Sequence, residues 1–330
     1  MKKLLSLLLF TSVISFAQIS KVDFDKQTKL IMGNDPQAAL VSLENFEKKF
    51  PADAQVMCLR GLYQFRDSNP NGALVTFSNA IKTNPKYAFS YACRAQVFAQ
   101  KELMDKAIAD ISQAIALEPK NIDFLLSRVD FYWKTNQYDL GLMDSKLILK
   151  LAPNEINRYV DVVNMTKKAG QNTNVDIVFE QAYANKNIPK YEVDLAFARF
   201  FLGENRFSDA KIKFDAALAT NEKEFTAQNF NDASVVEYKL KNLDRSILFC
   251  EKAIALEPTN IDYRNNLCGI LIDQKKWQKL KENAEVSIRN GTDSPMAHMY
   301  YAIGLKYTGF ESLALEYEKK AKQLEAEQNK

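Results

Sequence analysis

Four prolines recur in this chain at one constant spacing of about 34 residues, at Pro51, Pro85, Pro119 and Pro153. Each closes a segment whose apolar residues recur at the spacing expected of two short amphipathic helices. A fixed period of this length is typical of a supersecondary unit that cannot bury its apolar face alone and must stack on its neighbours. The sequence therefore predicts a solenoid, whose function resides in its surface.

Small residues recur in phase with these prolines. When each unit is counted from three residues past the preceding proline, the eighth position holds Gly61 and Ala95, the twentieth Ala107, and the twenty-seventh Ala80 and Ala114. Small side chains let two helices cross at close range, while large neighbours fill the remaining space. We therefore expect these positions to mark the contact between the two helices of each unit.

This pattern resembles the tetratricopeptide repeat, a helix-turn-helix unit of about 34 residues. The clearest copy spans 91–119 and ends in Ala-Leu-Glu-Pro, a run that returns at 255–258. The resemblance implies an all-α fold, an α-solenoid of about nine helix-turn-helix repeats forming a right-handed superhelix. The expected units after residue 19 are 20–53, 54–87, 88–121, 122–155, 156–190, 191–226, 227–260, 261–294 and 295–328.

The fifth unit departs from the pattern. Its twentieth position is Val175, its closing proline is absent, and Lys167-Lys168-Ala169-Gly170 occupies the end of its first helix. One interpretation is a bend or looser joint between two halves of the chain. The other is ordinary drift in a tolerant repeat, and both stay open at this point.

The N-terminus is a segment of another kind. Lys2 and Lys3 precede an apolar run over 4–16, and Ser15-Phe16-Ala17 supplies small residues for cleavage. These parts predict a bacterial-type signal peptide over 1–17 and an exported protein, periplasmic or envelope-associated or secreted. The run is shorter than the roughly 20 residues of a membrane span. We expect no stable span after cleavage; an uncleaved anchor is the alternative.

The charge balance excludes one class of partner. Loss of Lys2 and Lys3 would leave 42 of the 44 basic residues against 41 acidic ones, a net charge near +1. A chain this neutral offers no basic field for a nucleic-acid backbone. We expect a protein or peptide partner and no nucleic acid.

Signs of catalysis are weak. The one histidine, His298, falls where the repeat places a packing residue, and Asp144 and Asp215 are interpreted as solvated faces of second helices. The sequence has no glycine-rich phosphate loop and no cluster of cysteine and histidine with metal-ligand spacing. We expect no enzyme, and no catalytic residue, metal or cofactor.

Export gives the cysteines a possible role. Cys250 lies on the second helix of one unit and Cys268 on the first helix of the next, so their sulfurs could meet across the joint. A disulfide is one interpretation, and two buried free thiols are the other.

The resemblance also places a candidate binding surface. In tetratricopeptide arrays a second stripe on each first helix lines the concave groove. Here that stripe includes Leu62, Phe65, Arg66, Phe89, Gln96, Gln100, Asp123, Asp130, Trp133, Lys134, Asn164, Lys168, Arg199, Tyr238 and Lys239.

Trp133 is the informative member of this stripe, because aromatic and arginine anchors often dominate binding. Its alternative role is packing between neighbouring units. Asn164, Lys168 and Arg199 are the nearest approach to the clamp with which some relatives grip a C-terminal carboxylate, but the full pattern is missing.

The expected function is an adaptor that docks a peptide or partner protein in the cell envelope. The alternative is a ligand-capture protein that takes up an oligosaccharide or peptide, with Trp133, Phe65 and Tyr238 as stacking platforms.

Overall fold

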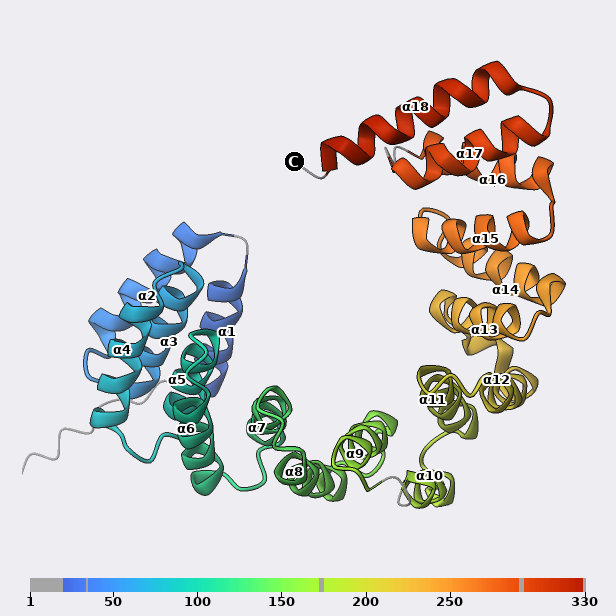
Figure 1. Cartoon of the computed structure of the whole chain (residues 1–330). Helices are drawn as coiled ribbons and strands as arrows, with labels where there is room; N and C mark the ends of the chain where they lie inside the picture. The colour runs from blue at the N-terminus through green and yellow to red at the C-terminus, as the bar shows by residue number, and fades with distance from the viewer. Residues whose placement is uncertain (1–19, 34, 172–174, 291–293, 329–330) are drawn as a thin grey trace, which may run out of the picture. The chain divides into compact units, whose positions relative to one another are not determined.

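The computed structural model describes residues 20–33, 35–171, 175–290 and 294–328. Within these ranges the chain is a tandem series of helices without a strand (Figure 1). The α-helices are Lys21–Met32 (α1), Pro36–Lys49 (α2), Ala54–Arg66 (α3), Pro70–Thr83 (α4), Ala88–Gln100 (α5), Met104–Leu117 (α6), Ile122–Lys134 (α7), Tyr138–Leu151 (α8), Ile156–Lys168 (α9), Val175–Ala184 (α10), Lys190–Gly203 (α11), Phe207–Asn221 (α12), Ala227–Lys239 (α13), Leu243–Leu256 (α14), Ile261–Asp273 (α15), Trp277–Arg289 (α16), Pro295–Tyr307 (α17) and Glu311–Gln328 (α18). A short 3-10 helix, Glu222–Glu224 (η2), follows α12.

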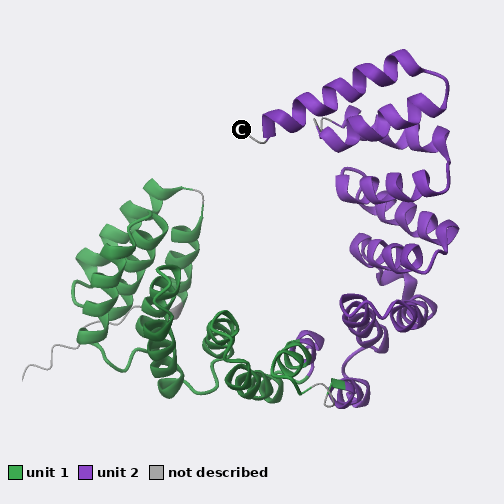
Figure 2. Cartoon of the chain, in the orientation of Figure 1, with its two compact units in different colours: residues 1–153, 161–175 green, residues 154–160, 176–330 purple. Residues whose placement is uncertain are grey.

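The chain forms two compact units, coloured separately in Figure 2. The first comprises residues 1–153 and 161–175, and the second comprises 154–160 and 176–330. The division falls inside the fifth expected repeat and crosses α9. The predicted signal peptide lies outside the described residues. No helix in the described part of the chain combines the length and apolar character needed to cross a bilayer.

Local sequence explains where the helices begin. The side chain of Asp53 accepts hydrogen bonds from the backbone of Gln55 at 2.7 Å and Val56 at 3.2 Å, which caps α3. Asn121 caps α7 in the same way. These caps satisfy backbone N–H groups that have no partner inside the helix. Pro70 stands in the first turn of α4, where its missing N–H costs nothing.

A left-handed residue recurs in the turn between the helices of a pair. Glu102 has φ of +58°, and the N–H of Leu103 donates to the carbonyl of Phe98 at 2.9 Å, which closes the end of α5. From the α3–α4 pair onward the same left-handed conformation occurs once per helix pair, at nearly equal intervals, at Ser68, Glu102, Asn136, Gly170, Asn205, Lys241, Lys275 and Gly309. The repeat period is thus present in the backbone as well as in the sequence.

The small residues of the repeat lie where the helices cross, as predicted. Ala80, Ala95, Ala107 and Ala114 are all fully buried. Gly61 on α3 is buried too, and the ring of Phe77 on α4 occupies the space that a side chain there would need. Close contact of helix backbones therefore depends on these small side chains.

Two ion pairs of the first unit also follow the period. The guanidinium of Arg94 binds the carboxylate of Asp110 at 2.7 and 2.8 Å, and one repeat later Arg128 binds Asp144 at the same distances. Each arginine also donates to a serine of the preceding unit at 3.0 Å. Asp144 is only 6% exposed, so its interpretation as a solvated residue was wrong. A paired carboxylate inside the stack is what makes that burial tolerable.

The fifth repeat replaces this ion pair. At the positions of Arg128 and Asp144 it carries Val162 and Val178, which are 1% and 7% exposed. Both charged members are exchanged together for apolar ones, so neither is left unpaired in the interior. The departure of the fifth repeat from the pattern is therefore one of packing chemistry as well as of turn sequence.

Candidate functional site

Within the first unit, a cavity of about 480 Å³ opens on the first helices of successive repeats. We call it the aromatic groove. Its apolar lining is Met32, Leu62, Phe65, Phe77, Phe89, Ala92, Cys93 and Phe124, and its polar lining is Arg66, Gln96, Gln100, Asp123 and Ser127. Apart from Met32 and Phe77, all of these lie on α3, α5 and α7.

Helical spacing brings these side chains to one surface. Leu62, Phe65 and Arg66 lie at i, i+3 and i+4 on α3 and so share one face. On α5, Phe89 and Gln96 lie two turns apart on the face that meets this row. The structure thus brings together the predicted stripe residues of three repeats, from Leu62 to Asp123.

Sequence reasoning missed other residues of the aromatic groove. Phe77, Phe124 and Cys93 were not assigned to the surface. All three are buried, yet each forms part of the cavity wall. The available signal for Phe124 and Cys93 was their position beside stripe residues on the same helices, whereas Phe77 lies on α4, which carries no stripe residue.

The polar side chains that line the aromatic groove differ in whether they have hydrogen-bond partners within the chain. Arg66 donates from its guanidinium to the backbone carbonyl of Ile31 at the end of α1. Gln96 Nε2 donates to Ser127 Oγ at 3.2 Å, which links α5 to α7. Asp123 is exposed, and its carboxylate makes no ion pair or hydrogen bond with the part of the chain that the structure describes.

A second cavity of the first unit, about 260 Å³, lies between α7 and α9 beside Trp133. Asp130 and Asn164, two other predicted stripe residues, also line it. Trp133 is 39% exposed; its ring meets Tyr138 edge-on at 5.7 Å, and Lys168 Nζ lies 5.3 Å from its centroid. Both interpretations of Trp133 therefore describe part of its surroundings, since it packs on neighbours and also lines a cavity.

The remaining cation on α7 is paired. Lys134 Nζ lies 2.7 Å from the carboxylate of Asp130, one helical turn earlier. Both side chains are about half exposed, so this contact is a surface ion pair of small energetic weight.

No family model and no curated protein matches this sequence. Solved structures do resemble it. Yeast Tom70 aligns over 86% of this chain and 59% of its own length, with 18% identity and a TM-score of 0.55. A tetratricopeptide repeat protein from Parabacteroides merdae aligns over 75% of this chain and 97% of its own, with 16% identity and a TM-score of 0.49.

The chain has a tetratricopeptide repeat fold. The likeness to Tom70 supports this assignment, and so does the run of helix pairs with one left-handed residue in each pair from α3–α4 onward. At these identities the comparison shows the fold alone, and the match spans about three fifths of Tom70.

In the second unit of this tetratricopeptide repeat array, the predicted stripe residues have partners of their own. Arg199 lies 3.0 Å from the carboxylate of Asp232 and also donates to Asn229, so its guanidinium is already engaged. Tyr238 donates to Asp273 at 2.7 Å and lines a cavity of about 200 Å³. Lys239 is exposed.

The structure does not contain the Cys250–Cys268 disulfide, because all four cysteines are free thiols. Cys250 Sγ lies 3.0 Å from Ser234 Oγ, and Cys268 Sγ accepts from Asn283 at 3.1 Å. Both thiols belong to one apolar cluster of the second unit, which matches the interpretation as two buried free thiols.

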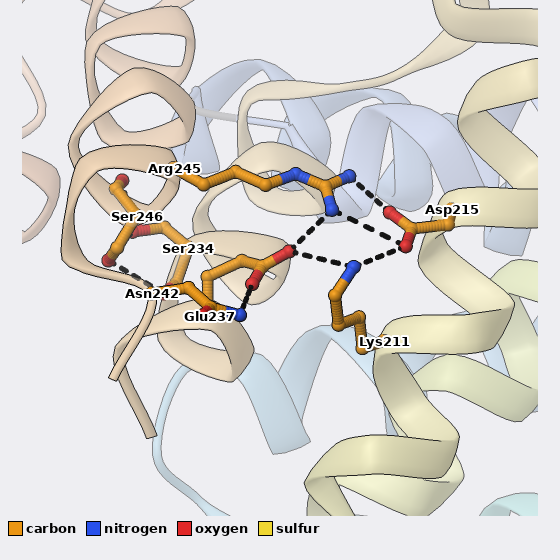
Figure 3. Close-up of polar contacts among 7 residues, drawn as sticks. All are labelled: Lys211, Asp215, Ser234, Glu237, Asn242, Arg245 and Ser246. Carbon is orange, nitrogen blue, oxygen red and sulfur yellow. Dashed lines mark hydrogen bonds and ion pairs between the residues drawn. The ribbon is translucent and has the colours of Figure 1, made fainter. Parts of the chain in front are cut away.

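The second unit also holds a charge network between successive repeats (Figure 3). Glu237 is only 2% exposed, and its carboxylate lies 2.9 Å from Arg245 and 3.4 Å from Lys211. Asn242 donates to the other oxygen at 2.7 Å. Asp215 bridges the same two cations, so it is not the solvated residue that the sequence suggested. The two carboxylates and two cations of this network link α12, α13 and α14.

Burial also removes His298 from the surface. It is fully buried on α17, and its ring stacks on Tyr317 with the centroids 5.6 Å apart. Among the described residues, no group of three or more histidine, cysteine and acidic side chains is arranged to hold a metal ion.

Proposed function

We propose that this chain is a non-enzymatic scaffold that docks an extended peptide segment of a partner protein in the aromatic groove. The observation that carries the proposal is the groove itself, a half-open cavity of about 480 Å³ with mostly apolar walls and a few polar groups at its edge. Sites with this composition bind ligands by burying apolar anchors, while the polar groups fix orientation.

Two features favour a segment of chain over a compact small molecule. The helix α7 contributes to both the aromatic groove and the cavity beside Trp133, so a ligand that follows the first helices meets both. Gln96 and Gln100 at the edge carry amides, which can donate to and accept from a peptide backbone. The mechanism is reversible docking without bond chemistry.

The alternative of oligosaccharide capture has less support. A sugar would need an open ring face as a stacking platform, but Lys168 lies over the ring of Trp133 and Tyr138 covers its edge. Of the other two proposed platforms, Tyr238 has Lys241 Nζ 5.5 Å from its ring centroid, and Phe65 lines the aromatic groove.

The proposed location is the bacterial cell envelope, where the chain would serve as an adaptor after export. The sequence of residues 1–17 supports this, as described above. Mass spectrometry of the N-terminus after expression in a bacterium tests it. A chain that begins at Gln18 in the periplasmic fraction is expected, whereas an intact Met1 in the cytoplasm contradicts export.

Site-specific blocking tests the docking proposal. Gln96→Trp places a large side chain over the aromatic groove from an exposed position on α5. Gln113→Trp is the matched control, since it makes the same change at an exposed glutamine on the second helix α6. In crosslinking from the envelope, a partner is expected with wild type and Gln113→Trp and should be lost with Gln96→Trp. Identical capture by all three proteins would exclude the groove.

A further inference from the structure

The charged side chains of the aromatic groove differ in whether they have partners within the chain. Two charged side chains line it, Arg66 and Asp123. Arg66 is partly buried and donates its guanidinium to the carbonyl of Ile31, so it already has an acceptor. Asp123 is exposed, and its carboxylate has no ion pair or hydrogen bond with any described residue. Arg66 keeps its positive charge, but the charged group of the groove that is both exposed and without a described partner is the carboxylate of Asp123.

The cavity beside Trp133 has a second carboxylate of α7, Asp130, which is paired with Lys134. Asp130 lies two helical turns after Asp123 and therefore on the same face of α7. It lines the second cavity, while its partner Lys134 does not. The face of α7 that contributes to both cavities thus presents two carboxylates, and the one at the aromatic groove has no counter-charge within the described chain.

We infer that the segment bound in the aromatic groove carries a lysine or arginine next to an aromatic or branched apolar side chain. The apolar side chain enters between α3 and α5, against Phe65 and Phe89, and the cation pairs with Asp123. This inference rests on the proposed function and adds the chemistry of the partner. An acidic segment is disfavoured at the exposed edge on α7, because it would meet the unpaired carboxylate of Asp123.

Asp123 also has a structural role that a test must separate from binding. It lies in the first turn of α7, where a negative charge is favourable to the helix dipole. Asp105 has the same place in the first turn of α6 and is exposed, but it lines neither cavity of the first unit. Asp123→Lys and Asp105→Lys therefore both place a positive charge in the first turn of a helix, which the helix dipole disfavours. The two variants differ in that only residue 123 lines the groove.

The probe is a display library of random dodecapeptides, panned on the folded full chain and on three variants: Asp123→Lys, Asp105→Lys and Gln96→Trp. Wild type and Asp105→Lys are expected to enrich peptides that combine lysine or arginine with an aromatic or branched residue. Asp123→Lys should shift the enrichment toward aspartate and glutamate. For the most enriched peptide, Asp123→Lys should weaken binding by about fivefold or more, as for a pair at a solvent-exposed edge.

Two other outcomes separate this inference from the proposal on which it rests. Wild type could enrich apolar peptides that show no preference for either charge, and the Gln96→Trp variant could fail to enrich them. That result would overturn the inference and leave the groove as a docking site. If the Gln96→Trp variant enriches the same peptides as wild type, both the inference and the proposed function are overturned.

Discussion

Gly61 and Phe77 are in direct contact across the hairpin of α3 and α4. A Cβ atom placed on Gly61 would lie 2.4 Å from Cε1 of Phe77, well inside van der Waals contact. Phe77 is fully buried, so its ring cannot swing into solvent to make room. The ring of Phe77 fills the space beside residue 61, so only glycine fits at that position. The size of one repeat residue thus limits the size of another.

Gly61→Ala is accordingly expected to lower the free energy of unfolding by about 1–3 kcal/mol, the usual cost of overpacking a core. Gly269→Ala on α15 is the control, because a Cβ there meets nothing within 4 Å. It should be neutral or stabilise the helix by up to about 1 kcal/mol. Urea unfolding followed by circular dichroism measures both, and equal effects would refute the packing explanation.

The ion pair of Arg128 and Asp144 provides a second prediction. Arg128→Val should cost about 3 kcal/mol, because it leaves the mostly buried carboxylate of Asp144 without its partner. Adding Asp144→Val should restore stability to within about 1 kcal/mol of wild type. The fifth repeat already carries valine at both positions.

A double-mutant cycle in guanidinium chloride measures this coupling. Lys134→Gln serves as the control, since its pair with Asp130 is exposed and should contribute less than about 1 kcal/mol. Additive costs for the two valine substitutions would show that the pair does not act as a unit.

The left-handed turns offer a route to stabilisation. Glu102 adopts φ of +58°, a conformation that strains a residue with a Cβ atom. Glu102→Gly should raise the free energy of unfolding by about 0.5–1 kcal/mol, whereas Glu102→Ala should leave it nearly unchanged. Gly309→Ala should have the opposite effect, because Gly309 has φ of +89°. Thermal melts compare the three, and destabilisation by Glu102→Gly would contradict the strain argument.

The buried thiols predict a dependence on alkaline pH. Burial raises the pKa of Cys250 to about 11 and of Cys268 to about 12, and hydrogen bonds from Ser234 and Asn283 offset this only in part. In the unfolded chain both thiols should titrate near pH ~8.5. The folded state therefore holds its protons longer, so stability is complete below pH ~8.5 and falls as pH rises toward these folded values.

Urea unfolding at pH 8 and at pH 10 checks this direction. The loss of stability between the two should be smaller in Cys250→Ala/Cys268→Ala than in wild type. Alkylation of the native protein by iodoacetamide should also be slow at pH 8 and complete in denaturant. Rapid alkylation of either thiol in the native protein would contradict its burial.

Much of this fold could be predicted from the sequence, because repeat period and helical periodicity are local properties. The small residues from Gly61 to Ala114 and the proline spacing indicated paired helices, and these positions are buried as expected. Carboxylates were harder to interpret. Asp144 and Asp215 have the sequence context of exposed helix residues, and only the arginine on a neighbouring helix explains their partial or full burial.

The candidate site was predicted in part. The stripe of first-helix residues identified Leu62, Phe65 and Arg66 as surface positions, and they do line one cavity. The sequence could not show that the guanidinium of Arg66 donates a hydrogen bond to the carbonyl of Ile31, 35 residues earlier. Nor could it show that Trp133 is shared between packing and a cavity, because both roles require the same exposed position on a helix.

By itself, then, the sequence determined the repeat, the helix pairs and the face of each helix that packs, since each follows from spacing along the chain. Tertiary structure decided which of those side chains have partners. Arg66 is engaged, Asp123 is not, and Cys250 and Cys268 are neighbours without a bond. Partners depend on distances across helices from different repeats, and a constant repeat spacing specifies only that such helices meet.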